Sequence, residues 1–426
     1  MNDDFQNKAI NTLRFLSADG VQQANSGHPG LPMGTAAIAF TIWTKHLKFD
    51  PKNPDWADRD RFILSGGHGS MLLYSLLHLT GYAVSLEDLK HFRQWGSCTP
   101  GHPEFGFTPG VDTTTGPLGQ GLSNGVGMAI AEAHLAAEFN RPDHKIVDHY
   151  VYGIVTDGDL MEGVASEAAS LAGHLKLGKI IYCYDDNHIS IDGPTTLAFT
   201  EDRAKRFESY GWHISFVADG NDVEEIDRAI NAAKNDPRPS LIVCRTHIGF
   251  GMPNRQDTSK AHGEPPGDEE LNAAKRNLGW PEEPRFLIPN DIKAFFLKKG
   301  EDGGAKKTTW DSAFAQYGKE FPTEAKEFTR RMSGKLPDKW ESALPEFPAD
   351  AKGMASRVAS GNTLNAIAGV LPELMGGSAD LTPSNNTWLK ESTAFQAENP
   401  IGRYLHFGVR EHGMGAVVNG MAYHKG

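Results

Sequence analysis

The feature that most constrains the fold is an alternation of short apolar runs and helix-like segments along the first part of the chain. The runs that fit buried strands cover residues 61–65, 150–156, 179–184, 212–218 and 240–246. Helical patterns lie between them at 70–79, 164–175 and 223–234. Strands that alternate with helices build parallel sheets with right-handed crossovers. We therefore predict an α/β fold: a parallel sheet with helices on both faces.

The alternation weakens after residue 253 and resumes near residue 351. The charged stretch EDGGAKK at 301–307 is typical of an exposed loop. We predict a first α/β domain over 1–310, a linker over 311–350, and the N-terminal part of a second α/β domain over 351–426.

The second domain is expected to be incomplete. The pattern predicts a helix at 360–371, strands at 374–379 and 403–407, and a helix from Glu411. Two strands cannot form a complete parallel core with both faces covered. We therefore expect the chain to be truncated, or its second sheet to be completed by other polypeptide.

Charge and cysteine usage narrow the functional classes. Acidic residues outnumber basic ones by 54 to 42, which gives a net charge of −12 and argues against a general nucleic-acid or anionic-membrane surface. No apolar run approaches ~18 residues, and the first residues lack the pattern of a signal peptide. The three cysteines, Cys98, Cys183 and Cys244, form no CxxC pair and are typical of free thiols. We expect a cytoplasmic protein that binds neither nucleic acid nor membrane.

The most informative motifs, DGDLMEG and DDNHISIDG, follow two successive predicted strands. If these strands are parallel neighbours, Asp157 and Asn187 emerge at the same edge of the sheet. With one backbone carbonyl they would form an all-oxygen site that suits Mg²⁺ and phosphate. The helix after Gly163 would direct its amides to the same place, and Gly158 would let backbone approach closely. The alternative is an ordinary turn, which Asp-Gly and Asn also favour.

A glycine-rich stretch, TTTGPLGQGLSNGVGMA, precedes these motifs. Gly119 and Gly121 start a G-x-G pattern, but Asn124 occupies the position of the third glycine, so the dinucleotide fingerprint is absent. No P-loop pattern is present either. The stretch fits either a close-packed turn before a helix or a backbone contact with a cofactor.

Four histidines lie in loops rich in Gly and Pro: His28, His68, His102 and His262. A single loop histidine is usually a surface residue, but four in similar settings favour a shared site for sugar hydroxyls or proton transfer. A structural zinc site is the competing hypothesis, which no ligand spacing supports. In FGVREHGMG, Glu411 lies where a strand gives way to a helix, and a helix-start carboxylate is the simpler interpretation.

Together these motifs resemble the transketolase family of thiamine-diphosphate enzymes. The resemblance rests on SGHPG, SGGHGS, GHPE, GPLGQG, DGDLMEG, DDNHISIDG, AHGEP, GGSADLTPSN and GVREHGMG, which occur in the family's order along nearly the whole chain. It departs from the family pattern at Thr156, where a glycine is common, and at Pro266, where leucine is usual. The rest of the pyrimidine-binding domain and the C-terminal domain of the family are missing.

The resemblance implies a role for each matching residue. It implies that Asp157, Asn187 and the Ile189 carbonyl hold the metal, normally Mg²⁺, with Ca²⁺, Mn²⁺ or Co²⁺ able to substitute. Cofactor contacts are implied for His68, Gly116, Pro117, Leu118, Gly158, Asn187, His262 and Glu411. Sugar-phosphate contacts are implied for His28, His102, His262, Arg357 and Ser384. Glu411, His28 and His262 are the implied catalytic residues.

The implied reaction is the reversible transfer of a two-carbon ketol unit from a ketose phosphate to an aldose phosphate. It would pass through a thiamine diphosphate ylid and an enamine, in the pentose phosphate pathway or the Calvin cycle. The resemblance also implies a homodimer whose active sites lie between subunits, with Glu162 and Glu167 near that interface. Two alternatives remain open: an inactive fragment that binds cofactor weakly or only associates with a partner, and a related thiamine enzyme that makes deoxyxylulose phosphate or acts on dihydroxyacetone.

Overall fold

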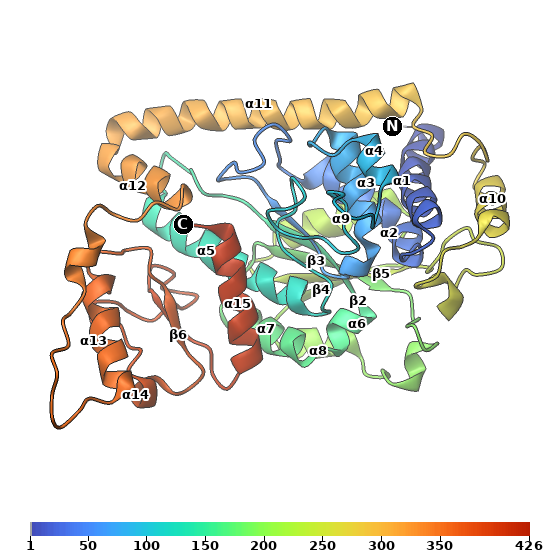
Figure 1. Ribbon diagram of the computed structural model, residues 1–426. Helices are drawn as coiled ribbons and strands as arrows, with labels where there is room; N and C mark the ends of the chain where they lie inside the picture. Colours follow the sequence, from blue (N-terminus) through green and yellow to red (C-terminus); the bar gives the residue numbers. More distant parts are fainter. Residues whose placement is uncertain (1) are drawn as a thin grey trace.

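The computed structural model describes residues 2–426 and places a five-stranded parallel sheet at the centre of the first unit (Figure 1). The strands are β1 (Arg61–Leu64), β2 (Val151–Thr156), β3 (Ile180–Asp186), β4 (His213–Val217) and β5 (Ser240–Arg245). Their order is β1-β2-β3-β5-β4, and every neighbouring pair is parallel. All five strands were predicted, with bounds that differ by one or two residues.

Helices cover both faces of this sheet, as predicted (Figure 1). One face carries α1 (Asp3–Ala24), α2 (Gly30–Thr41), α3 (Ser70–Thr80) and α9 (Val223–Lys234). The other carries α5 (Gln120–Phe139), α7 (Gly163–His174), α8 (Arg203–Ser209) and α15 (Glu411–His424).

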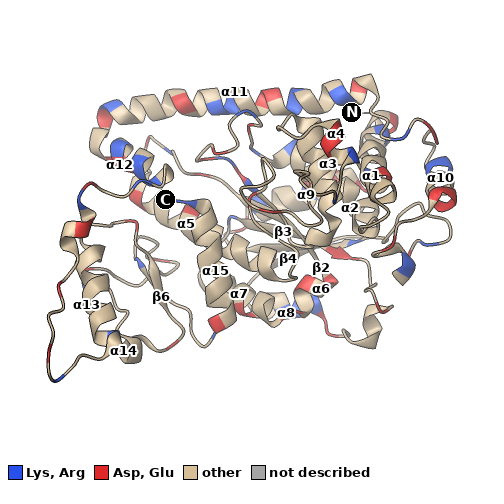
Figure 2. Ribbon diagram, in the orientation of Figure 1, with Lys and Arg blue, Asp and Glu red and all other residues tan. Residues whose placement is uncertain are grey.

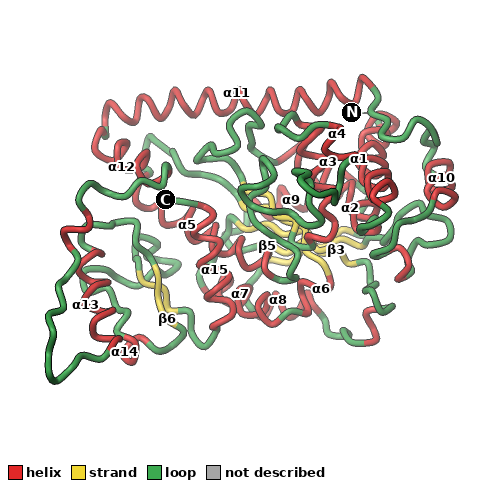
Figure 3. Tube along the Cα trace, viewed as in Figure 1, coloured by secondary structure: helices red, strands yellow, loops and turns green. Residues whose placement is uncertain are grey.

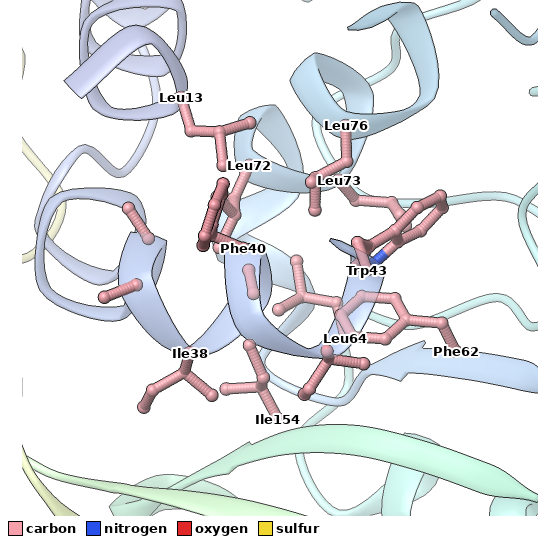
Figure 4. Close-up of a cluster of buried hydrophobic side chains, with 14 of the residues drawn as sticks. Leu13, Ile38, Phe40, Trp43, Phe62, Leu64, Leu72, Leu73, Leu76 and Ile154 are labelled. Atoms are coloured by element: carbon pink, nitrogen blue, oxygen red, sulfur yellow. The ribbon is translucent and has the colours of Figure 1, made fainter. Parts of the chain in front are cut away.

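Successive side chains along each strand point to opposite faces of the sheet and so enter two different hydrophobic cores. In β3, Ile181 and Cys183 enter the first core, whereas Ile180, Tyr182 and Tyr184 enter the second. Figure 4 shows the first core, in which side chains of α1, α2 and α3 pack on β1 and β2. Each large apolar side chain buried in this way contributes ~1.5–3 kcal/mol of transfer free energy, so the cores hold the strand tips in fixed positions.

The shorter elements connect this framework. The helices are α4 (Leu86–Lys90), α6 (Asp157–Met161), α10 (Asp268–Asn277), α12 (Pro322–Met332), α13 (Ser356–Ala368) and α14 (Thr382–Asn385). A π-helical turn covers Ile42–His46, and 3₁₀ turns cover Gly67–Gly69, Thr195–Leu197, Ser259–Ala261 and Trp340–Ala343. Directly after β2, residues 157–161 form the short helix α6, which is capped by the side chain of Thr156.

The predicted loop at 301–307 is wrong, because these residues lie inside α11 (Asn290–Glu320), a continuous helix that also passes through the expected domain boundary at 310 (Figure 3). Its glycines serve packing. A Cβ on Gly303 would lie 1.8 Å from the Phe49 carbonyl oxygen, and one on Gly300 would lie 2.3 Å from that of Thr80. Charged residues of both signs along the exposed side (Figure 2) gave the segment the composition of a loop.

The second unit contains α13, α14 and the parallel pair β6 (Gly376–Ser378) and β7 (Tyr404–His406), followed by α15. The predicted strands and the helix from Glu411 are confirmed. α15 docks against α5 of the first unit at very close range: a Cβ on Gly127 would lie 1.9 Å from the Val417 carbonyl oxygen, and one on Gly420 would lie 1.9 Å from that of Asn124. Glycines at the crossing therefore set the position of α15.

Two further expectations concern the cysteines and membranes. All three cysteines are free, as predicted, and Cys183 and Cys244 are buried. Among residues 2–426, no helix combines the length and apolar composition needed to cross a membrane.

Candidate active site

A cavity of about 550 Å³ opens at the carboxyl edge of the sheet. β2 and β3 end side by side there, because Thr156 pairs in register with Asp185. Asp157 and Asn187 follow these strand ends, and both line the cavity, as predicted. Of the other predicted site residues, the lining includes His28, His68, Leu118, Gly158, Ile189 and His262.

Asp157 presents a carboxylate oxygen without a donor. The Tyr184 hydroxyl donates to Oδ1, whereas Oδ2 is buried and has no hydrogen-bond partner within residues 2–426. Burial raises the pKa of Asp157 to about 6, against the lowering effect of the Tyr184 hydrogen bond. A buried polar atom without a partner is costly. A cation beside Oδ2 would satisfy it, so this oxygen fits a metal ligand.

Asn187 is fixed by its neighbours. Its Nδ2 donates to Asp185 Oδ2 at 2.9 Å, and its Oδ1 accepts from the Ile189 amide at 2.9 Å. The Thr246 hydroxyl donates to the other oxygen of Asp185. Burial raises the pKa of Asp185 to about 7. Sequence reasoning missed Asp185 and Tyr184, whose role is to orient the predicted ligands.

The oxygen donors come from different chemical groups. Within the described residues, no cluster of three or more His, Cys, Asp or Glu side chains has a metal-binding arrangement. One carboxylate, one amide and one carbonyl form a set of hard oxygen donors, which suits Mg²⁺ rather than zinc.

The glycine-rich turn is fastened to the same strand ends by Asp159. Its carboxylate accepts from the Gly119 amide at 2.8 Å, the Ser65 hydroxyl at 2.7 Å and the Thr156 amide at 2.9 Å. Close packing follows: a Cβ on Gly158 would lie 2.7 Å from Leu118 Cδ1. Asp159 was not predicted, although its position next to the Asp157 motif was a signal.

Only part of the predicted turn 116–118 reaches the cavity. Leu118 lines it, whereas Gly116 packs against the ring of His102, whose Cγ would lie 3.1 Å from a Cβ at position 116. Pro117 is not among the lining residues. The turn is therefore both a close-packed helix start and, through Leu118, a wall of the cavity.

The four predicted histidines converge. The ring centroid of His28 lies 5.2 Å from that of His68, 5.6 Å from that of His262 and 6.4 Å from that of His102. Burial, then the neighbouring His262, lowers the pKa of His28 to about 4. Burial likewise lowers the pKa of the other three rings. Near neutral pH the cluster is therefore uncharged and offers hydrogen-bond donors and acceptors.

Arg93 joins this cluster and was missed by sequence reasoning. Its Nη1 donates to Ser26 Oγ at 2.9 Å, and its Nη2 lies 3.5 Å from His28 Nδ1. Its charge is one of the causes that lower the pKa of His28. A guanidinium beside neutral imidazoles makes this wall of the cavity electropositive, which favours an anionic ligand.

Three predicted residues lie elsewhere. Arg357 is on α13, Ser384 on α14, and Glu411 begins α15; none lines the cavity of its own chain. Glu167 of α7 accepts a hydrogen bond from the Gly413 amide at 2.6 Å, which ties α15 to the first unit. The second unit thus presents Glu411 on a firmly docked helix outside this cavity.

The histidine cluster makes stability depend on pH. Because the pKa of His68 in the folded chain is far below its value of ~6.5 in the unfolded chain, the unfolded chain binds the extra proton first. The neutral His68 ring therefore makes its full contribution to stability above pH ~6.5, and this contribution is lost as the pH falls below that value. We expect the thermal midpoint to drop on acidification, and less steeply in His68→Asn. The exposed His91→Asn is the control, and equal slopes in both variants would contradict the prediction.

These features define an α/β protein with a ligand-sized cavity, lined by oxygen donors and histidines, at the carboxyl edge of a parallel sheet, where ligands bind in folds of this class. Residues 5–337 match the family profile described as "Transketolase, thiamine diphosphate binding domain", and residues 352–426 match "Transketolase, pyrimidine binding domain". The chain belongs to the transketolase family.

Named relatives agree with this assignment. The chain is 55% identical over 419 residues to a transketolase of Nostoc sp., covering 98% of this chain and 62% of the relative. It is 56% identical over 420 residues to transketolase 2 of Aliivibrio fischeri, covering 98% of this chain and 63% of the relative.

Solved structures show the same fold. A Pichia stipitis transketolase in complex with sedoheptulose 7-phosphate superposes with a TM-score of 0.96 at 47% identity, covering 99% of this chain and 63% of that one. A Campylobacter jejuni transketolase superposes with a TM-score of 0.91 at 43% identity, covering 100% of this chain and 64% of that one. The chain thus spans a little under two thirds of the length of these relatives.

Proposed function

We propose that the intact protein is a transketolase that transfers a two-carbon ketol unit from a ketose phosphate to an aldose phosphate. The observation that carries this proposal is the cavity in which the donor-free Oδ2 of Asp157, Asn187 and the three neutral histidines His28, His68 and His262 meet. The sugar phosphate bound by the Pichia stipitis relative supports the substrate class.

Asp157 and Asn187, with the Ile189 carbonyl, would hold Mg²⁺, and the metal with Gly158 would hold the diphosphate of thiamine diphosphate. His68, Leu118 and the Gly116–Pro117 turn would contact the cofactor. When bound, the cofactor supplies the electron sink needed to break and form the carbon–carbon bond. Asp185 and Tyr184 keep the two side-chain ligands oriented through their hydrogen bonds.

The histidines would contact the substrate. His28, His102 and His262 would hydrogen-bond the sugar hydroxyls and the reacting oxygens, because a neutral imidazole offers one N–H donor and one acceptor nitrogen. Proton transfer at those oxygens is part of the same proposal. His262 would also contact the cofactor. Burial, His262 and Arg93 together keep His28 neutral, and Arg93 adds positive potential beside the substrate.

We infer a cytoplasmic homodimer in which the second unit of each chain serves the cavity of the other. Glu411 would then hold a proton at a nitrogen of the cofactor's pyrimidine ring, and Arg357 and Ser384 would bind the sugar phosphate. Supporting this, all three residues lie outside the cavity of their own chain, while α15 is docked firmly by Gly413, Gly420 and Gly127.

The test is ketol transfer by the intact protein with thiamine diphosphate and Mg²⁺. We expect Glu411→Gln to lower kcat by about 10²–10⁴-fold, with cofactor affinity changed far less. Glu391→Gln, an exposed carboxylate of the same unit, is the matched control. Absence of transfer by the intact wild-type protein, or an undiminished kcat in Glu411→Gln, would refute the proposal.

A further inference from the structure

A second cavity, of about 300 Å³, lies at the opposite edge of the sheet, between the two units. Tyr150 and Lys179 line it immediately before β2 and β3 begin, and Lys234 lines it at the end of α9. The second unit closes it with Phe395 and the residues that follow to Pro400. Because the candidate active site lies at the carboxyl ends of the same strands, the two cavities are separate.

Lys234 brings to this cavity a positive charge that no ion pair neutralises among residues 2–426. Its Nζ donates to His46 Nδ1 at 3.1 Å and lies 5.5 Å from the centroid of the Tyr150 ring. Burial lowers the pKa of Lys234, and the more distant carboxylates of Asp60 and Asp227 offset only part of that effect. An ammonium group that is partly removed from water without a counter-ion costs free energy. A bound anion would recover part of that cost.

Lys179 contacts the same ring. Its Nζ lies 4.4 Å from the Tyr150 centroid and forms an ion pair with the half-exposed Asp148. Lys176 lines the cavity as well, and its ion pair with Glu398 of the second unit, at 3.3 Å, is largely exposed. The exposed pair of Lys176 is weak, so Lys176 remains able to bind an anion. Lys179 is less exposed, and burial alone would lower its pKa, but the hydrogen bond to Asp148 and the negative charge nearby together raise it, so Lys179 stays charged.

The acidic residues of the lining do not cancel these charges. Asp236 is engaged by Arg238 at 2.8 Å. Glu132 is only 4% exposed, and burial raises its pKa to about 8. Its carboxyl group is therefore protonated near pH 7 and can donate a hydrogen bond. The remaining wall is apolar, from Ala129, Ala133, Leu175, Leu177 and Phe395.

We propose that this cavity binds a small phosphate monoester, with the phosphate between Lys179 and Lys234 and the organic part against the apolar wall. Two ammonium groups match a dianion, and lysine is a common phosphate ligand. The volume lies at the small end of ligand pockets, which fits a compact metabolite. Because residues 395–400 come from the second unit, the ligand also holds the two units together.

The test uses the intact protein carrying Arg357→Leu and saturated with thiamine diphosphate and Mg²⁺. The candidate active site is then filled with cofactor and lacks its proposed phosphate contact, so the phosphate ester used as a probe should not bind there. Glycerol 3-phosphate is titrated calorimetrically. We expect binding at one site per chain, a higher unfolding midpoint, and about tenfold or greater weakening in Lys234→Met. Lys179→Met, which removes the other proposed phosphate ligand, is expected to weaken binding similarly. This variant is the one to be measured if Lys234→Met does not fold.

Lys306→Met is the matched control, because Lys306 is an exposed lysine that acts on Lys234 only through its charge and does not line the cavity. It should change affinity by no more than about twofold. Equal affinity in wild type and the foldable lysine variant would overturn the proposal, as would succinate binding as tightly as glycerol 3-phosphate. These measurements do not involve ketol transfer, so their outcome does not depend on whether the protein transfers ketol units.

Discussion

Replacing Asp157 with asparagine is expected to weaken thiamine diphosphate binding in the presence of Mg²⁺ by about 100-fold or more. The substitution removes the negative charge at the buried oxygen that has no donor, while an amide oxygen can still accept from the Tyr184 hydroxyl. A neutral ligand attracts a divalent cation far less strongly than a carboxylate. Isothermal titration of the cofactor at fixed Mg²⁺ measures the change.

The control is Asp192→Asn, since Asp192 is an exposed carboxylate that lines the same cavity. If the general negative potential of the cavity mattered rather than one ligand, both variants would lose affinity alike, and the assignment of Asp157 would be wrong. The stability of the cofactor-free Asp157→Asn protein should be at least that of the wild type, because the substitution removes a buried charge.

The sheet was predictable because its signals are local. Residues 223–234 show why: Asp222 caps the helix by accepting from the Glu224 and Glu225 amides, and Val223, Ile226 and Ile230 fall on one buried face. The helix bounds match the prediction. The same reasoning failed for 301–307, where the charged stretch suggested a loop but Gly303 permits the close approach of α11 to Phe49. A composition typical of a loop thus occurs in a helix here, because the segment packs against Phe49, which is distant in sequence.

In the candidate site, too, some residues could be predicted from local sequence signals and others could not. Asp157 and Asn187 could be placed together because both follow parallel strands, and strand order fixes their edge. The convergence of His28, His68 and His262 could only be hypothesised, since no spacing rule joins loops so far apart. Asp159, Asp185 and Arg93 were missed because each has a partner that is distant in sequence: Gly119 for Asp159, Thr246 for Asp185 and His28 for Arg93. Asp159 and Asp185 lie within the two strand-end motifs, whereas the surroundings of Arg93 carry no sign of its role.

Glycine at position 420 should be among the least replaceable residues outside the cavity. A Cβ there would lie 1.9 Å from the Asn124 carbonyl oxygen of α5, which is backbone and cannot rotate away. Gly420→Ala must therefore push α15 off α5. We expect a loss of about 3 kcal/mol or more in the free energy of unfolding, measured by chemical denaturation, together with faster proteolysis of the segment after α12.

Gly415→Ala separates this clash from the general effect of adding a methyl group to α15. Gly415 lies in the same helix, and nothing lies within 4 Å of a Cβ at that position. Alanine lowers the entropy cost of forming a helix, so this variant should gain about 0.5–1 kcal/mol. Opposite signs for the two substitutions would establish that close contact between α5 and α15 positions Glu411. If Gly420→Ala were as stable as Gly415→Ala, the docking of the second unit described here would be wrong.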